Sequence, residues 1–507
     1  MTRRSPAPPP RRTAAPWRRP GRRRAPSARR PVRTVGPPRC PSGQGLGTRV
    51  PVDWAWRGDA PAPHHRSGST GPPPLSSNTP RAALGGALAA ALVAAGIAAS
   101  PATAASKPPK PVKVRSTPDN VVYGGFPIDR RPVSTVKPGQ VVTIDTLSSV
   151  GITVPDVSPV QYFGKLGVKA SDVLPDATAF WKTLPKRTKY AGVHTLTGPV
   201  DVAGAEPGDT LEIEVMDLQT RVPYGVNLTA PDSGVFSTTY PGFRPGDAPL
   251  RIPTAPADAI AGLAPDVRQH LLRTGRSKRK GSRGKEVVFF ARGVEVPLHK
   301  FMGVMAVKPA DGAYVGYTPG AGPYPDGVQS SVPPGPYGGN LDVRDLTVGS
   351  KLYLPVFQKG AGFYTGDSHS VQGDGEVSGT ANEQSLVGTF RFKVHKRRST
   401  GPYAEDAKNW MVMGIDHDLD RALKLSVRRA VKWLVDHKGM TEAKAYSFAS
   451  IAVDFTISEA VDRTQVVTGR IPKDVFFRSG RVKAGALAER ARTTKASVPI
   501  ARHDHGH

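Results

Sequence analysis

The sequence predicts a β-rich α+β protein with antiparallel and mixed sheets, long Gly/Pro loops and a C-terminal helical segment. Three observations lead to this prediction. Between residues 106 and 395, several short runs alternate apolar with polar residues, as half-buried strands do. The chain holds 54 glycines and 52 prolines, which separate these runs. After Val394 the apolar spacing changes from period two to helical spacing.

Each predicted element follows from such a pattern. Strands are expected over 140–146, 209–215, 390–394 and 466–472, and a long Gly/Pro loop over 318–340. A helix is expected over 418–437, because its apolar residues recur at helical spacing and Gly439 follows as a stop signal. Thr441 is expected to cap a second helix that runs to about residue 451. We assign residues 396–482 to the same folded unit as 106–395.

The first 80 residues differ in composition from the rest. They carry 16 Arg, no Lys and two acids, so they hold +14 of the formal net charge of +29. Such an Arg- and Pro-rich segment cannot bury enough apolar surface to fold, so we expect disorder. Two interpretations stay open: a polybasic arm for nucleic acid or anionic lipid, or a segment outside the working protein.

Residues 81–105 favour the second interpretation. Arg81 precedes a short Ala-rich apolar run, and small residues follow up to Ala104 and Ala105. This is the organisation of a secretory signal peptide, and the run is too weakly hydrophobic for a stable membrane span. We therefore expect a secreted or cell-envelope protein, cleaved near Ala104-Ala105, whose translation start was assigned too far upstream. Cys40, the single cysteine, would be lost, leaving no thiolate ligand or nucleophile.

Two further basic segments have ordinary explanations. Residues 271–285 hold seven Lys or Arg, and we read them as an insertion that forms a solvated loop in preference to a binding patch. Residues 483–507 form a basic tail with His503, His505 and His507, which we expect to be frayed and not a metal site.

The stretch over 366–383 concentrates groups that carry chemistry. Asp367, His369, Asp374, Glu376 and Glu383 lie among several glycines, although ionisable groups are costly to bury unless paired or metal-bound. Asp367 and His369 are two residues apart, as are Asp374 and Glu376. In an extended backbone this spacing places both members of a pair on the same face. A surface Asp-Gly turn is the alternative. We predict an active site.

Residues 113–477 resemble the acetamidase/formamidase family. The blocks that carry the resemblance occur in order over 194–200, 204–211, 338–342, 349–356, 366–383 and 471–473. The resemblance implies a catalytic unit that hydrolyses small aliphatic amides to a carboxylate and ammonia. The basic segment 271–285 departs from the family pattern.

The residues suggest how such a reaction could proceed without a cysteine or a Ser–Ser–Lys nucleophile loop. A divalent metal, which we expect to be zinc, would lower the pKa of bound water and polarise the carbonyl. The candidate ligands are Asp342, Asp367, His369 and His194. Glu376 is the candidate general base, Asp374 its orienting partner and Asn340 an oxyanion donor.

For three of the residues a structural role stays open. His194 could bond to loop backbone, Asp342 could cap a turn, and Glu383 could either support a ligand or form a surface salt bridge.

We conclude that the sequence predicts a metal-dependent hydrolase of small linear amides. A non-catalytic exported protein that uses the metal pocket to bind a small ligand is the alternative. Specific nucleic-acid binding is not expected once residues 1–105 are removed, nor is a membrane span in the mature chain. The sequence is compatible with a homo-oligomer.

Overall fold

The computed structural model describes residues 111–230, 233–237, 267–316, 324, 326–397 and 399–477. The chain divides into two units, 1–100 and 101–507, and all described residues belong to the second. The predictions for residues 1–80, 81–105 and 483–507, and for part of the loop over 318–340, lie outside the described residues. Among the helices in the described ranges, none is long and apolar enough to cross a membrane.

The largest element is a nine-stranded sheet in the order β1-β4-β15-β6-β13-β16-β17-β19-β18. Among these described strands, β1 and β4 pair in parallel and the other neighbours are antiparallel. The strands are β1 (Val112–Val114), β4 (Val141–Asp145), β6 (Thr210–Thr220), β13 (Lys351–Pro355), β15 (Leu386–His395), β16 (Tyr403–Glu405), β17 (Asn409–Asp416), β18 (Asp454–Glu459) and β19 (Gln465–Pro472).

A second sheet has the order β12-β11-β14-β5-β2, with β3 pairing in parallel with β5. Its strands are β2 (Val121–Tyr123), β3 (Ser134–Val136), β5 (Thr195–Val202), β11 (Phe301–Ala306), β12 (Gly338–Asn340) and β14 (Phe363–His369). A third, four-stranded sheet comprises β7 (Tyr224–Thr229), β8 (Arg268–Arg276), β9 (Glu286–Ala291) and β10 (Val294–Pro297).

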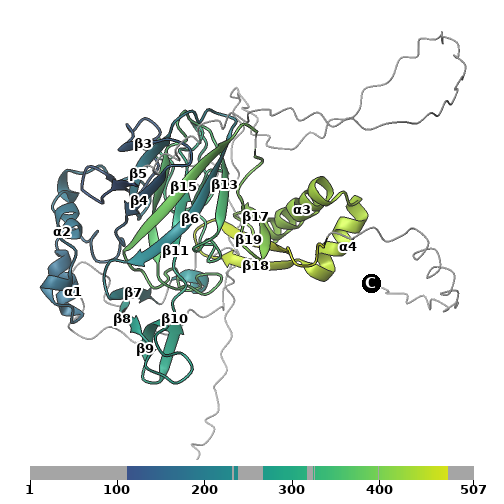
Figure 1. Cartoon of the computed structure of the whole chain (residues 1–507). Helices are drawn as coiled ribbons and strands as arrows, with labels where there is room; N and C mark the ends of the chain where they lie inside the picture. The colour runs from purple at the N-terminus through teal and green to yellow at the C-terminus, as the bar shows by residue number, and fades with distance from the viewer. Residues whose placement is uncertain are drawn as a thin grey trace, which may run out of the picture. The chain divides into compact units, whose positions relative to one another are not determined.

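The main hydrophobic core lies between the nine-stranded and the six-stranded sheets (Figure 1). Phe363 of β14 packs edge-on against Phe390 and Phe392 of β15, with ring centroids 5.4 and 5.1 Å apart. These aromatic contacts join the strand that carries the candidate site to the centre of the larger sheet. The site residues on β14 are therefore held by a fully buried scaffold.

The predicted strands are confirmed at β4, β6, β15 and β19, and with them the β-rich α+β class with mixed sheets. In β15, Phe390 and Phe392 are fully buried, whereas Lys393 is exposed. This alternation is the one read from the sequence, because successive side chains of a strand point to opposite faces.

The C-terminal helices also form where the sequence places them. Helix α3 (Leu419–Lys438) begins after Asp418, whose side chain accepts a hydrogen bond from the Arg421 backbone N–H, and ends at Gly439 with φ +63°. Helix α4 (Glu442–Ala452) is capped by Thr441. Both helices share a small core with β17 and β19, next to which Figure 1 shows them.

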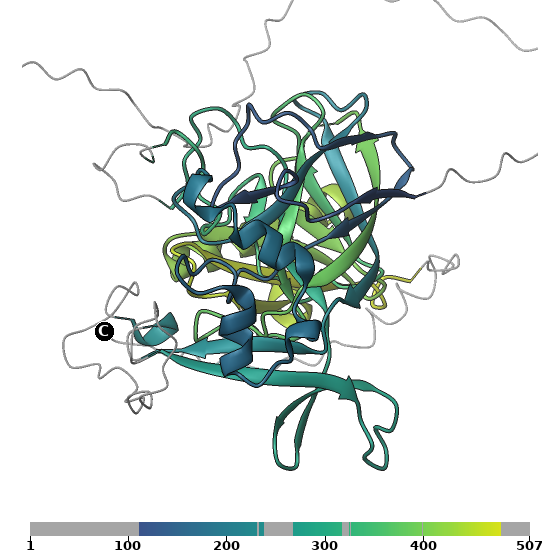
Figure 2. The ribbon, with the colours of Figure 1, turned by 90° about the vertical axis from the view of Figure 1, so that its left-hand side faces the viewer.

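Two short helices were missed by the sequence reasoning. Helices α1 (Pro159–Lys165) and α2 (Pro175–Trp181) pack with β2 and β7 around a second core, and lie close together in Figures 1 and 2. Seven residues are too few to show helical periodicity. Ser158 and Gln161 nevertheless form a capping box around Pro159, which was a readable start signal.

The basic segment over 271–285 contains a strand as well as a loop. Its first residues belong to β8, and a turn over 277–285 connects β8 to β9. Ser277 is buried in this turn and its hydroxyl donates to Glu295 at 2.6 Å. The basic segment therefore forms an ordered hairpin with exposed cations.

Candidate functional site

The site begins at the end of β14, where Asp367 and His369 lie side by side as predicted. Asp367 Oδ2 is 3.3 Å from His369 Nε2. Asp367 has φ +46°, and Gly303 of the neighbouring strand β11 faces it. A Cβ at Gly303 would lie 2.4 Å from Asp342 Oδ1 and 2.6 Å from Asp367 Oδ2. A glycine at 303 is therefore what allows these two carboxylates to converge.

The chain after β14 folds back onto the strand. An antiparallel bridge pairs His369 with Glu383, and Glu383 also exchanges two backbone hydrogen bonds with Val226, each 3.0 Å long. Glu383 Oε1 lies 3.2 Å from His369 Nε2 and accepts a hydrogen bond from the Ala381 N–H. Glu383 is therefore buried beside the candidate ligand His369, where it can support that ligand, and among the described residues it does not form a surface salt bridge.

The same segment brings Glu376 to His369 but leaves Asp374 outside. The backbone of Gly375 bonds to the end of β18, and Glu376 Oε1 then lies 3.9 Å from His369 Nε2. Asp374 is exposed, and its Oδ2 is 3.5 Å from Arg470 Nη2. The expectation that Asp374 and Glu376 share one face is wrong, because this segment forms turns and not a strand.

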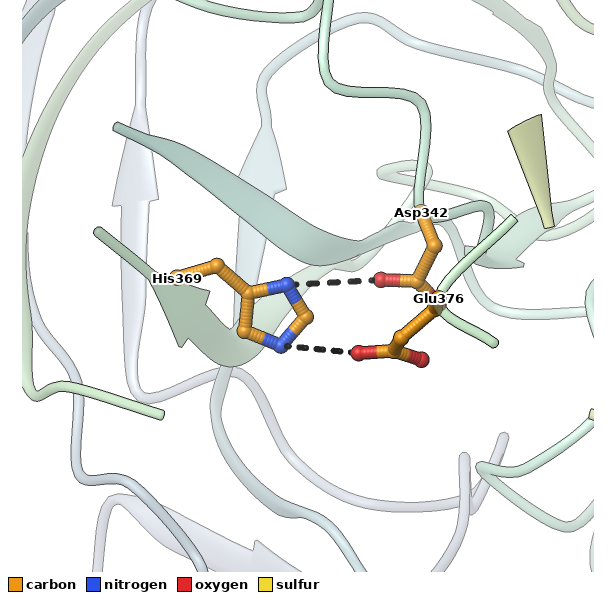
Figure 3. Close-up of side chains that lie close together, drawn as sticks. All are labelled: Asp342, His369 and Glu376. Atoms are coloured by element: carbon orange, nitrogen blue, oxygen red, sulfur yellow. Dashed lines mark ion pairs between the residues drawn. The ribbon is translucent and has the colours of Figure 1, made fainter. Parts of the chain in front are cut away.

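Asp342 approaches His369 from the other side (Figure 3). It lies just after β12, is fully buried, and places Oδ1 3.6 Å from His369 Nδ1. Neither carboxylate oxygen has a hydrogen-bond partner among the described residues, so Asp342 does not cap a turn there. The imidazole of His369 therefore has an acidic group near each nitrogen.

Two carboxylates of the site were missed by the sequence reasoning. Glu459 and Asp462 lie where β18 turns into β19, and with Asp342 and Glu376 they form a group whose oxygens lie within 4.8 Å of one another. Glu459 is fully buried; one of its oxygens accepts the Val461 and Asp462 N–H groups and the other has no partner among the described residues. In the sequence, these two acids lie shortly before the apolar strand β19, and such a pattern is also typical of an ordinary turn.

His194 and Asn340 lie at the edges of the cluster. His194 Nδ1 is 3.1 Å from both the carbonyl and the hydroxyl oxygen of Ser331, while Nε2 is 3.9 Å from Asp367 Oδ1. The loop-bonding role considered for His194 is therefore present, and the second nitrogen still faces the cluster. The Asn340 amide nitrogen donates to Asp462, so its expected oxyanion role would have to use the second hydrogen of that amide.

Three of the site carboxylates adopt left-handed backbone conformations. Asp342, Asp367 and Glu376 have φ of +47°, +46° and +43°. This region is disfavoured for residues with a side chain, most of all for the longer Glu, and costs of the order of 1–3 kcal/mol each. The surrounding structure must hold these conformations, and such backbone outliers typically cluster at functional sites.

Negative charge in the cluster exceeds what its imidazoles can balance. Burial raises the pKa of Asp342 well above its ordinary value, and Asp367 raises it further. Burial likewise raises the pKa of Glu376, with Asp342 and Glu459 adding to the shift. For Asp462, burial is the largest cause of a rise in pKa to about 7. Without an additional positive charge, several of these groups would have to be protonated.

For Asp367 and His369 the pKa shifts favour the charged forms, because carboxylate and imidazole groups lie close together. Burial raises the pKa of Asp367, but the charges of His369 and His194 outweigh it and lower the pKa below its ordinary value. Burial lowers the pKa of His369, but Glu383 and Asp367 outweigh it, so the pKa is well above the ordinary value. Among the described residues, two imidazoles thus serve six carboxyl groups: Asp342, Asp367, Glu376, Glu383, Glu459 and Asp462.

The donor set fits a divalent cation. Both oxygens of Asp342 and both nitrogens of His369 are buried without a hydrogen-bond partner among the described residues. Asp342, His369 and Glu376 form one group of converging ligand atoms, and Asp367, His369 and Glu383 form another. Carboxylate oxygens and imidazole nitrogens are ligands that divalent metals use in proteins, and a cation would offset the excess charge.

The fold and the site define a β-rich α+β protein with a buried carboxylate–imidazole centre between two sheets. A family profile described as "Acetamidase/Formamidase family" matches residues 186–314 and 325–478, which is more than half of the chain. The chain belongs to the acetamidase/formamidase family, as the sequence blocks indicated.

Relatives with curated descriptions match part of the chain. It is 30% identical over 209 residues to a formamidase of Methylophilus methylotrophus, covering 37% of this chain and 47% of that protein. It is 29% identical over 209 residues to an acetamidase of Mycolicibacterium smegmatis, covering 37% and 50%. The chain thus aligns with about half the length of the curated relatives it matches.

A solved structure shows the same fold over a longer stretch. The crystal structure of an acetamidase from Yersinia enterocolitica matches with a TM-score of 0.52 and 24% identity, covering 73% of this chain and 94% of that one. At this level of identity the match concerns the fold alone.

Proposed function

We propose that this protein hydrolyses small linear amides to a carboxylate and ammonia. The observation that carries the proposal is the charge imbalance of the buried centre, in which six carboxyl groups converge on two imidazoles. A structural core does not need such a group, because buried carboxylates destabilise a fold unless they are paired or bind a cation. Family membership, with relatives described as formamidase and acetamidase, supplies the reaction class.

We propose that the centre holds a divalent metal, with zinc as the expected ion. Two groups of converging atoms could hold it: Asp342 and His369, with Glu376 beside them, or Asp367, His369 and Glu383. When bound, such an ion lowers the pKa of a water molecule and polarises an amide carbonyl. Asp342 and His369 are both fully buried, and neither oxygen of Asp342 has a hydrogen-bond partner among the described residues. We therefore favour this pair as ligands, with Glu376 beside the ion and not bound to it.

The size of the substrate is limited by access to the centre. The side chains of His369 and Asp342 are fully buried, and those of His194, Asp367, Glu376 and Glu383 keep only 5–10% of their surface exposed. A formamide- or acetamide-sized molecule fits such a restricted opening better than a peptide does. Excluding bulk water also strengthens electrostatic interactions with the reacting carbonyl.

Glu376 is the residue we propose to take up and return a proton. Its Oε1 faces His369 Nε2 at 3.9 Å, so its carboxylate reaches the centre without being hydrogen-bonded to the imidazole. General-base action at a nucleophilic water and later protonation of the departing amine both require a carboxylate that can move a proton at this position. If Glu376 is itself a ligand, Glu459 is the nearest alternative, since one of its oxygens is unpaired among the described residues.

The test is ammonia release from formamide, acetamide and propionamide, before and after chelation and after zinc is restored. We expect turnover of at least one of these amides, loss on chelation and recovery with zinc. Asp342→Asn should abolish turnover, and Asp374→Asn is the matched control, because Asp374 lies outside the cluster. A protein that binds the metal and an amide without releasing ammonia would support the non-catalytic alternative.

We also propose that residues 81–105 direct export of the chain. The charged flank, the short apolar run and the small residues before Ala105 support this. N-terminal sequencing of the native protein should find a mature chain that begins near residue 106. A mature chain that retains residues 1–80 would contradict the proposal.

A further inference from the structure

A pocket lies away from the carboxylate cluster and shares none of its residues. It has a volume of about 330 Å³ and lies between helix α3 and the segment that follows β15. Helix α3 contributes residues 429, 432, 433, 436 and 437, whose spacing places them along one helical face. The opposite wall includes Arg397, Gly401 and Tyr403.

The charge of this pocket is positive. Arg397, Arg429 and Lys432 line it, and Asp436 is the one acidic residue among the described residues of its lining. Asp436 is already paired with Lys432, with 3.0 Å between Oδ2 and Nζ. The two guanidinium groups have no ion pair with a described residue.

Arg429 is the unusual member of the pocket. Its guanidinium lies against Gly401, where a Cβ would be 2.7 Å from Nη2, and its Nη1 donates to the Met413 carbonyl. Burial lowers the pKa of Arg429 to about 10, and no carboxylate of the described residues offsets that shift. A guanidinium has five N–H donors and is costly to bury without an anion. The remaining donors thus lack a partner of opposite charge in the part of the chain that the structure describes.

We propose that this pocket binds a small organic oxyanion, a carboxylate or a phosphate ester, through Arg429 with Arg397 at the mouth. A planar guanidinium binds such groups with two parallel hydrogen bonds. The organic part of the ligand would contact Trp433, which lines the pocket next to Arg429. The stacking of His437 on Trp433, with ring centroids 4.7 Å apart, keeps this aromatic wall in place.

The test is isothermal titration calorimetry of the full chain with inorganic phosphate, phenyl phosphate and acetate in separate experiments. We expect saturable binding of at least one anion with a Kd of about 1 mM or below, a range common for small ligands with few contacts. Binding of the phosphates alone would assign the site to phosphate esters, and binding of acetate alone would assign it to carboxylates. Tighter binding of phenyl phosphate than of phosphate would confirm the aromatic contact.

Substitutions in the pocket test whether an anion binds there or at the carboxylate cluster. Arg429→Gln should weaken binding at least tenfold, and Arg397→Gln provides a second variant at an exposed position that should fold normally. Arg428→Gln is the matched control, because it removes the same charge from an exposed neighbouring position that does not line the pocket. Binding that is unchanged in both pocket variants, binding that is weakened equally in the control, or no saturable binding at all would overturn the proposal.

Discussion

Replacing Gly303 with alanine tests whether the two aspartates of the site must converge. The added Cβ would lie 2.4 Å from Asp342 Oδ1 and 2.6 Å from Asp367 Oδ2, whereas real Cβ contacts are essentially never under 3.0 Å. To reach 3.0 Å, the carboxylate of Asp342 must move by at least 0.6 Å and that of Asp367 by at least 0.4 Å. The Asp367 carbonyl oxygen, 2.9 Å away, limits how far the strand can adjust.

A misplacement of about 1 Å can cost on the order of 100-fold in rate, and here two carboxylates are displaced together, each by about half that distance. We therefore expect Gly303→Ala to lower amide turnover by about that factor and to reduce metal content, while the far-UV circular dichroism spectrum stays that of the parent. Turnover is measured as ammonia release and metal content by elemental analysis. The added methyl is small, so the effect should come from displacement of the two carboxylates and not from loss of any ligand.

Gly164→Ala is the matched control for this substitution. Gly164 lies in α1 and does not need a positive φ, and outside its own helix no atom of the described residues lies within 4 Å of the position that an added methyl would take. Alanine at that helical position should leave turnover unchanged and slightly stabilise the fold. Full metal content and parental turnover in Gly303→Ala would refute the argument that the glycine keeps the space between Asp342 and Asp367 open.

Three other substitutions test separate parts of the structure. His369→Ala should strip the metal and abolish turnover while the fold survives, as elemental analysis and circular dichroism would show; full metal content would rule out this ligand. Glu376→Gln should lower turnover by about 10²–10⁴-fold with metal content unchanged, and a rate close to the parental one would make Glu376 structural. Burial raises the pKa of Glu212, but hydrogen bonds from His395 and Lys393 outweigh it and lower the pKa below 4.5. This group therefore stabilises the fold above pH 4.5 and loses that contribution as the pH falls through its lower folded-state pKa. Glu212→Gln should consequently lower the Tm at pH 7 more than at acidic pH, and an equal loss at both pH values would contradict this assignment.

The elements that the sequence predicted are those whose signal is local. The alternation around Phe390 and Phe392 repeats every second residue, and the caps at Asp418 and Thr441 lie directly before their helices. Such patterns are determined by which face is buried and by unpaired backbone N–H groups at a helix start, and both can be read within a few residues. Helices α1 and α2 were missed because each has only seven residues.

By itself, the sequence determined the family, the β-rich class and the stretch that carries Asp367, His369 and Glu376. Only the tertiary structure showed that Glu459 and Asp462 join these residues and that Asp374 does not. The physical reason is that a cluster of charge is assembled by contacts between strands far apart in the chain. Whether a carboxylate enters it depends on backbone conformation, such as the left-handed turn at Glu376, and on space left by a residue such as Gly303 in a neighbouring strand.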